Sequence, residues 1–229
     1  MKTLGVLCLS NDGDYTGHNA DFGPGIADPR RYEYPPVWRK VPGAWANNII
    51  SGDPALEDRY VKAAQELVRE GADAITCDCG FTVRYQQSIA AAVSVPVSTS
   101  SLLLLPTLLS GVPASKKIAI LTADSRCLET GIFATLGITD LSRLVVEGLE
   151  GTATYDYMLA EKGAIHVDDV LADIDGIIAR VQKHEHVAAI LCECTLFVRV
   201  SPSIRRVTGL SVYDATNNVA LLMASVGEK

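Results

Sequence analysis

Short runs of apolar residues alternate with longer amphipathic stretches along this chain. The runs stand at 4–9, 74–77, 95–98, 117–122, 188–192 and 210–213. They lack the polar alternation of a half-exposed strand, so we expect strands buried on both faces, as in a parallel sheet. Segments 56–70 and 170–184 show the apolar spacing of amphipathic helices, and each leads into one of these runs. The pattern predicts alternating helices and parallel strands.

The second half of the chain repeats the first at a spacing of 115 residues. An octapeptide of the form Cys-acid-Cys, ending in Val-Arg, starts at Cys77 and again at Cys192. The same spacing pairs a serine and an isoleucine in the helices expected next. This agreement indicates an internal duplication, in which each half runs helix, strand, cysteine loop, helix and strand. Arg84 and Arg199, which end the octapeptides, are expected to make structural contacts.

A duplication in a chain of 229 residues favours two domains of about 100 residues each. We expect a first α/β domain from residues 1–98 together with 214–229, and a second from residues 99–213. The last helix, expected over 217–226, then packs back on the first domain. The predicted fold class is α/β, with two pseudo-symmetric, open parallel-sheet (Rossmann-like) domains and the active site in the cleft between them.

The segment 11–42 differs from the rest because it is rich in glycine, proline and aromatic residues. This composition predicts a long ordered loop and no helix. A loop after the first strand of an open α/β sheet lies at its carboxyl edge, where such folds place ligands. We therefore expect a lid that lines the site, with a structural or subunit-contact role as the alternative. His18 is the histidine that this location brings nearest to the site.

Composition and charge narrow the classes of function. Hydrophobic residues make up 48% of the chain, charged residues 21%, and the net charge is -7. The basic residues are scattered, which argues against nucleic acid as a partner. The longest apolar stretch, 102–109, is interrupted by Pro106 and is too short to span a membrane, and the N-terminal run is too short for a signal peptide. We expect a cytoplasmic protein whose six cysteines are reduced.

Cys79 and Cys194 stand just beyond the carboxyl ends of equivalent predicted strands. In an open parallel sheet, residues at this place project into the ligand crevice. If the halves face one another, the two thiols approach a bound molecule from opposite sides. One thiolate can then remove the proton next to a carboxylate while the other thiol protonates the opposite face. This chemistry requires no metal and no pyridoxal group, so no cofactor is expected.

The loops that carry the thiols must also hold the carboxylate, because a carbon next to a carboxylate is a weak acid. Backbone N–H groups and hydroxyls of both cysteine loops are suited to this task. The helix N-termini that follow are expected to lower the pKa of both thiols. On these grounds the expected substrate-binding residues are Ser10, Asn11, Gly80, Phe81, Thr82, Thr195 and Leu196.

The neighbours of the two thiols leave alternatives open. Cys77 and Cys192 are expected to be buried strand residues, because free cysteine is among the most buried residue types. A metal site built from both Cys-X-Cys pairs and a redox disulfide are the alternatives. Asp78 and Glu193 either orient the thiols or are ordinary loop charges.

The motifs resemble the cofactor-independent aspartate/glutamate racemase superfamily, whose members carry a Cys-Asn-Thr type loop in one half and a Gly-Cys-Thr type loop in the other. The matching positions are 79–82 and 193–195. The resemblance covers nearly the whole chain: residues 5–7 look like the first strand of the family, residues 121–125 like its Thr-rich loop, and residues 212–214 like its returning strand.

The resemblance implies roles for particular residues. Cys79 and Cys194 would be the acid/base pair. Thr122 and Ser125 would contact the carboxylate of a small-molecule substrate. A homodimer is also implied.

Two departures from the family pattern concern the substrate. Leu196 stands where glutamate racemases have His and aspartate racemases have Glu, and Gly80 stands where Asn is usual. The site is therefore expected to take a less charged or bulkier substrate than glutamate or aspartate, with help from Tyr34 and Trp38 of the long loop.

The leading functional expectation is a cofactor-independent racemase or epimerase of an amino acid or related small carboxylate, which is an isomerase. The second cysteine favours racemisation, because the related arylmalonate decarboxylase manages with one. The alternatives are an enzyme like that decarboxylase or like maleate isomerase, a hydantoin racemase, or a non-catalytic protein that closes on a small ligand.

Overall fold

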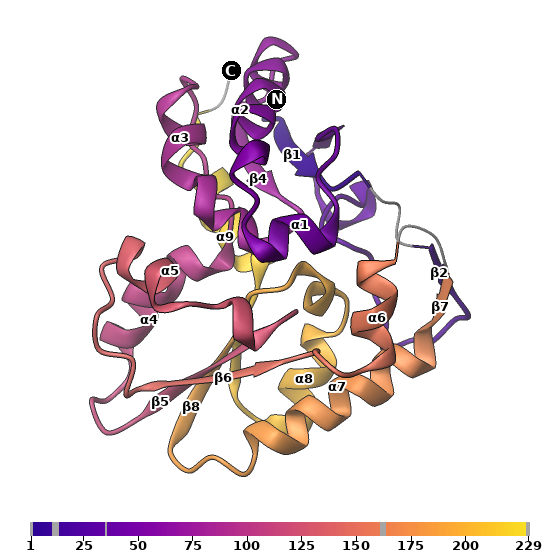
Figure 1. Ribbon diagram of the computed structural model, residues 1–229, viewed down its shortest axis with the longest axis vertical. Helices are drawn as coiled ribbons and strands as arrows, with labels where there is room; N and C mark the ends of the chain where they lie inside the picture. Colours follow the sequence, from indigo (N-terminus) through magenta and orange to yellow (C-terminus); the bar gives the residue numbers. More distant parts are fainter. Residues whose placement is uncertain (1, 11–13, 35, 161–163, 228–229) are drawn as a thin grey trace.

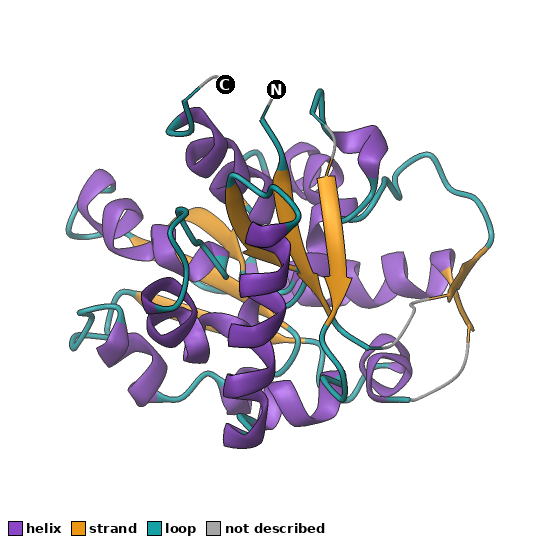
Figure 2. Cartoon of the chain, turned by 90° about the horizontal axis from the view of Figure 1, so that it is seen from above, coloured by secondary structure: helices purple, strands orange, loops and turns teal. Residues whose placement is uncertain are grey.

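The computed structural model describes residues 2–10, 14–34, 36–160 and 164–227. Two parallel sheets, with strand orders β3-β1-β4 and β6-β5-β8-β9, form its two halves. Figure 1 shows the first half above the second, with the two chain ends close together at the top. Helices surround the strands (Figure 2). The predicted class, α/β with parallel sheets, is confirmed.

The first sheet is built around β1 (Leu4–Cys8), in which every residue is buried. β1 pairs in parallel with β3 (Pro36–Lys40) on one side and with β4 (Ala74–Cys77) on the other. Beyond β4, Val97 forms a single parallel bridge with Ile75. The expected strand at 95–98 is therefore reduced to this one bridge.

The second sheet repeats this arrangement. β5 (Lys117–Thr122) lies between β6 (Leu144–Gly148) and β8 (Val187–Cys192), and β9 (Ser211–Tyr213) follows β8. Ile190 of β8 pairs with Val212 of β9, at the positions equivalent to Ile75 and Val97. The duplication seen in the sequence therefore extends to the register of the strands.

Helices join the strands, and the two long amphipathic ones were expected. In α2 the buried residues Tyr60, Ala63, Ala64 and Leu67 follow the spacing of one helix face. Within the described residues, none of the helices is both long and apolar enough to cross a bilayer. The helices are α1 (Ala46–Ser51), α2 (Glu57–Arg69), α3 (Gln86–Ala91), α4 (Leu105–Gly111), α5 (Thr130–Thr135), α6 (Ala153–Leu159), α7 (Val167–Val181), α8 (Ser201–Thr208) and α9 (Ala215–Ala224).

The last helix, α9, packs on the first sheet. Leu4 and Val6 of β1 share a buried cluster with Val219 and Met223 of α9. Leu7, on the other face of β1, belongs to the main core. This packing agrees with a return of the chain to the first half, whereas the domain boundaries 1–98 with 214–229, and 99–213, stay a prediction.

The segment 11–42 is not one continuous loop. Its described part contains β2 (Asp14–Thr16), a 3₁₀ turn at Pro29–Arg31 and the edge strand β3. β2 pairs in parallel with β7 (Ala164–His166), so this segment reaches the second half of the molecule, at the right of Figure 1. β3 was not predicted because its proline was interpreted as a loop signal, although proline is tolerated at the start of an edge strand.

Candidate active site

A cavity of about 230 Å³ lies where the carboxyl ends of both sheets meet. Its walls come from the residues just beyond β1, β4, β5 and β8, from the N-terminal segment and from α6. The volume is below the roughly 300–1,000 Å³ of pockets for drug-sized ligands. The cavity therefore suits a small molecule.

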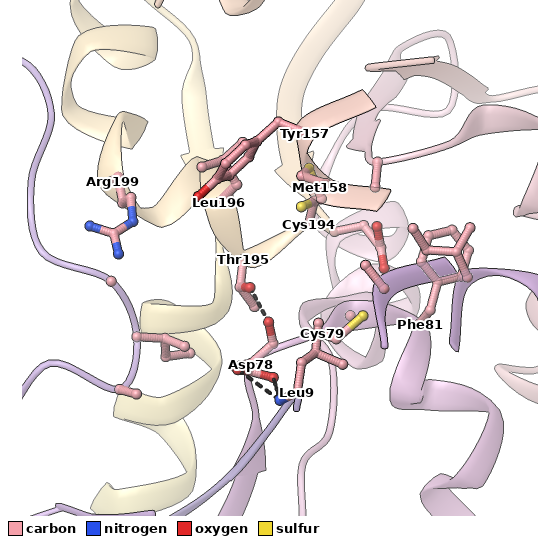
Figure 3. A pocket seen from close by; sticks show the side chains of 18 of the residues that line it. Leu9, Asp78, Cys79, Phe81, Tyr157, Met158, Cys194, Thr195, Leu196 and Arg199 are labelled. Carbon is pink, nitrogen blue, oxygen red and sulfur yellow. Dashed lines mark hydrogen bonds between the residues drawn. The ribbon is translucent and has the colours of Figure 1, made fainter. Parts of the chain in front are cut away.

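Both candidate thiols lie in this cavity. Cys79 follows β4 and Cys194 follows β8, and Figure 3 shows them on ribbons of the two different halves. Cys79 is partly exposed, whereas Cys194 is only 7% exposed. The backbone N–H groups of Phe81 and Leu196, equivalent in the duplication, act to lower the pKa of the Cys79 and Cys194 thiols respectively.

The expected lowering of the thiol pKa values is wrong. Burial raises the pKa of both Cys79 and Cys194 above the ordinary range, and the nearby Glu193 charge raises them further. The hydrogen bonds from the loop N–H groups act in the opposite direction but are outweighed. The chain after each cysteine is a 3₁₀ turn, so no α-helix N-terminus stands there.

Glu193 is a buried acid whose negative charge raises the pKa of both thiols. Its side chain is 1% exposed, and its Oε2 accepts a hydrogen bond from Thr122 Oγ1 at 2.8 Å. Burial raises the pKa of Glu193 to about 7. Its other oxygen, Oε1, has no hydrogen-bond partner among the described residues.

Asp78, the equivalent acid of the first half, is used differently. Its two carboxylate oxygens accept the N–H of Leu9 at 2.9 and 3.1 Å, as Figure 3 shows. Burial raises the pKa of Asp78 to about 7. The Asp78 carbonyl accepts the hydroxyl of Thr195, a bond that joins the two halves at the cavity floor. Asp78 thus fixes the loop, and neither acid is an ordinary surface charge.

The structure brings some predicted substrate contacts to the cavity and leaves others outside it. Gly80, Phe81, Thr195 and Leu196 line it. The remaining ones are engaged elsewhere: Ser10 donates to the Val41 carbonyl, Ser125 to Glu150, Thr122 to Glu193, and Thr82 is fully buried. Asn11 lies outside the described residues.

The N-terminal segment lines the cavity as expected, but through other residues than the ones singled out. Tyr15 and residues 25–28 form part of the wall. Trp38 is instead 57% exposed on β3, and Tyr34 stacks on Tyr32 with ring centroids 5.3 Å apart. His18 is exposed and is not part of the wall.

Two wall residues had no signal in the sequence. Tyr157 and Met158 come from the short helix α6 and line the cavity, and the Tyr157 ring extends toward Leu196 in Figure 3. They enter the site because α6 packs against α1 and α7, which is a tertiary contact. The sequence shows that these residues are aromatic and apolar but does not show that they lie at the site.

Cys77 and Cys192 are buried at about 1% exposure, as expected for strand residues. All six cysteines are free thiols. In the described ranges, no group of three or more Cys, His, Asp or Glu side chains is arranged to hold a metal ion. Arg84 and Arg199 make the expected structural contacts: Arg84 donates to the Cys127 carbonyl, and Arg199 to that of Gly23.

Solved structures share this fold. Allantoin racemase from Klebsiella pneumoniae matches 98% of this chain and 87% of its own with a TM-score of 0.64 at 12% identity. Unliganded arylmalonate decarboxylase matches 100% and 95% with a TM-score of 0.57 at 14% identity. Glutamate racemase from Aquifex pyrophilus matches 97% and 82% with a TM-score of 0.57 at 15% identity. The chain therefore has the fold of these racemases and of the decarboxylase, the fold that the resemblance predicted.

Sequence comparison gives a narrower assignment. The dimethylsulfoniopropionate lyase of Durusdinium sp. clade D is 33% identical over 93% of this chain and 71% of its own length. Dimethylsulfoniopropionate lyase 6 of Emiliania huxleyi (strain CCMP1516) is 29% identical over 98% of this chain, which spans 60% of that relative. No family model matches the chain. The chain belongs to the dimethylsulfoniopropionate lyase family, a family of enzymes.

The expected racemase or isomerase activity is wrong, because these relatives are named lyases. The cysteine pattern led to the wrong reaction type for a chemical reason. Two opposed thiols suit any reaction that begins by removing a proton next to a carboxylate, whether inversion or elimination follows. Racemases and a decarboxylase share this fold, so the fold alone does not determine which reaction a member catalyses.

Proposed function

We propose that this protein is a lyase that eliminates dimethyl sulfide from dimethylsulfoniopropionate. The observation that carries the proposal is the 33% identity to the Durusdinium lyase over 93% of the chain. The small cavity with two thiols and the buried acid Glu193 supports it. The substrate has a carboxylate and a dimethylsulfonio cation at opposite ends of two carbons, and its size suits the cavity.

The reaction is a balanced elimination. A thiolate of Cys79 or Cys194 removes a proton from the carbon next to the carboxylate and becomes a thiol. The electron pair of that C–H bond forms the double bond of acrylate. The carbon–sulfur bond breaks, its electron pair stays on sulfur, and the sulfonium leaves as neutral dimethyl sulfide. The thiol then returns its proton to solvent.

The resting thiols are protonated, because burial and Glu193 raise their pKa values. A bound sulfonium changes this balance, since a positive charge beside a thiol favours its thiolate form. The substrate thus helps to produce the base that attacks it. In this proposal the backbone N–H groups at the start of the 3₁₀ turns, at Gly80 and Thr195, hold the carboxylate and stabilise its enediolate form.

The test is release of dimethyl sulfide from dimethylsulfoniopropionate, measured by headspace gas chromatography with the Durusdinium enzyme as positive control. We expect activity in the wild type and a loss of about 10²–10⁴-fold in kcat for at least one of Cys79→Ser and Cys194→Ser. An elimination requires one base, so the two variants are expected to differ in the size of the loss.

Cys127→Ser is the matched control, because Cys127 is a free, partly exposed thiol outside the cavity wall. It should keep wild-type activity. The proposal is wrong if the wild type releases no dimethyl sulfide while the positive control does. The thiol mechanism is wrong if both cavity variants match Cys127→Ser.

A further inference from the structure

Glu193 lines the cavity and carries a buried carboxylate oxygen without a hydrogen-bond partner in the described part of the chain. This oxygen is Oε1, and the residue is 1% exposed. A buried polar atom without a partner costs free energy, and the cost is greater when the atom is charged. Such a cost at a ligand cavity points to a partner that arrives with the ligand.

Gly80 explains how the carboxylate reaches this place. A Cβ atom added to Gly80 would stand 2.4 Å from Glu193 Oε1 and 2.2 Å from the Glu193 carbonyl oxygen. The Glu193 side chain therefore occupies the space that a side chain at position 80 would fill. The polar group beside position 80 is therefore the Glu193 carboxylate, which belongs to the second half and carries a negative charge when ionised.

The other acids of the wall already have partners. Asp28 pairs with Arg30 at 2.5 Å, and both oxygens of Asp78 accept the N–H of Leu9. Glu193 is the wall acid that retains an unpartnered oxygen.

The cations near the cavity are also engaged. Arg199, the one basic residue in the described wall, lies 4.7 Å from the Tyr15 ring centroid and donates to the Gly23 carbonyl. Its guanidinium points away from the thiols in Figure 3. Arg84, whose charge reaches Glu193, donates to the Cys127 carbonyl and lies over the Phe81 ring.

We propose that the Glu193 carboxylate is the specificity-determining contact for the dimethylsulfonio cation of the substrate. This inference rests on the proposed function and goes beyond it by assigning one end of the substrate to one residue. A sulfonium has no N–H or O–H to donate, so its recognition depends on charge. The aromatic faces of the wall, such as Phe81, add weaker attraction for a cation.

The assignment has a kinetic consequence. The sulfonium loses its positive charge as the carbon–sulfur bond breaks, so Glu193 stabilises the bound substrate more than the transition state. An interaction of this kind lowers KM without raising kcat. Glu193→Gln should therefore raise KM on the order of ten- to a hundredfold, as expected for the loss of a close, partly screened charge pair, and leave kcat unchanged or higher.

The direct test compares two ligands that are not cleaved: trimethylammoniopropionate and 4,4-dimethylpentanoate, an isostere that keeps the carboxylate but has an uncharged carbon in place of the cationic nitrogen. Titration calorimetry is done above pH 7, where Glu193 is ionised. The wild type should bind the cation at least about tenfold more tightly than the isostere, and Glu193→Gln should lose most of that preference. Glutamine keeps the size of the side chain and an oxygen for Thr122.

Asp78→Asn is the matched control, because it removes the equivalent acid of the other half. It should retain most of the preference for the cation. Equal binding of both ligands by the wild type, or a preference that is as large in Glu193→Gln as in the wild type, would overturn the assignment. So would a fall in kcat at unchanged KM. These results are separate from failure of the proposed function, which is the absence of dimethyl sulfide release by the wild type.

Discussion

At the scale of single residues, the sequence located the thiols but not the group that controls them. The duplication placed Asp78 and Glu193 at equivalent positions, which left their roles open. One extra methylene and the glycine at position 80 separate them: Glu193 crosses to the other half, whereas Asp78 binds Leu9 in its own. The glycine in place of the usual asparagine was the available signal.

The influence of Glu193 on the thiols predicts a change in reactivity. Above pH 7 the ionised carboxylate raises the pKa of Cys79 and Cys194. Glu193→Gln removes that charge, so a larger fraction of both thiols is ionised and alkylation by iodoacetamide should be several-fold to about tenfold faster. Mass spectrometry of alkylated peptides measures each site separately.

Cys127 is the internal control in the same experiment, because Glu193 is not among the charges that shift its pKa. Its alkylation rate should stay the same in wild type and variant. An unchanged alkylation rate at both Cys79 and Cys194 would show that the charge of Glu193 does not affect the pKa of these thiols.

At the scale of elements, apolar runs identified the buried strands, because strands covered on both faces exclude polar residues. The expected runs at 74–77 and 117–122 coincide with β4 and β5. The edge strands β3 and β6 were missed. An edge strand needs no continuous apolar run, and β3 is only partly buried throughout apart from its exposed Trp38. Local pattern therefore predicts the centre of a sheet better than its borders.

Arg199 fastens the N-terminal segment over the cavity. It stacks on Tyr15 and Phe22 and donates to the Gly23 carbonyl. Replacing it with leucine removes these contacts, worth about 1–2 kcal/mol. We expect roughly tenfold faster proteolytic cleavage within residues 14–34, measured by limited proteolysis, because that segment opens more often.

Arg206→Ala is the matched control, since Arg206 makes an exposed ion pair with Asp21 at 2.9 Å in the same segment. Exposed pairs contribute little, so its cleavage rate should stay near that of the wild type. Equal cleavage of Arg199→Leu and Arg206→Ala would mean that Arg199 does not hold the segment.

At the scale of the whole molecule, two acids at the junction of the halves, the buried Glu193 and the partly buried Asp78, link stability to pH. Burial raises the pKa of Asp78 from 3.8, and of Glu193 from 4.5, to about 7 in the folded protein. Between these values the folded state binds more protons than the unfolded state. The contribution of each acid to stability is therefore greatest at low pH and falls as the pH rises toward 7.

Asp78→Asn and Glu193→Gln should abolish this contribution. The free energy of unfolding is measured by urea denaturation for each variant and for the wild type. The difference, variant minus wild type, should increase by at most about 1.4 kcal/mol per pH unit between about pH 4.5 and 7 and stay constant at higher pH. Other acids whose pKa is lowered on folding, such as Asp28 and Asp140, also make stability depend on pH. Their contribution is the same in wild type and variant, so it cancels when the wild-type curve is subtracted. A difference that is flat with pH would contradict the prediction.

The sequence by itself determined the α/β fold, the duplicated halves and the two thiols at equivalent strand ends. These features follow from local apolar pattern and from identical spacing, which are both written along the chain. Only the tertiary structure decided which groups share the cavity: Tyr157 from α6, the N-terminal segment fastened by Arg199, and Glu193 inserted against Gly80. Burial and contacts between distant segments set the charge of a site, and neither can be read from local pattern.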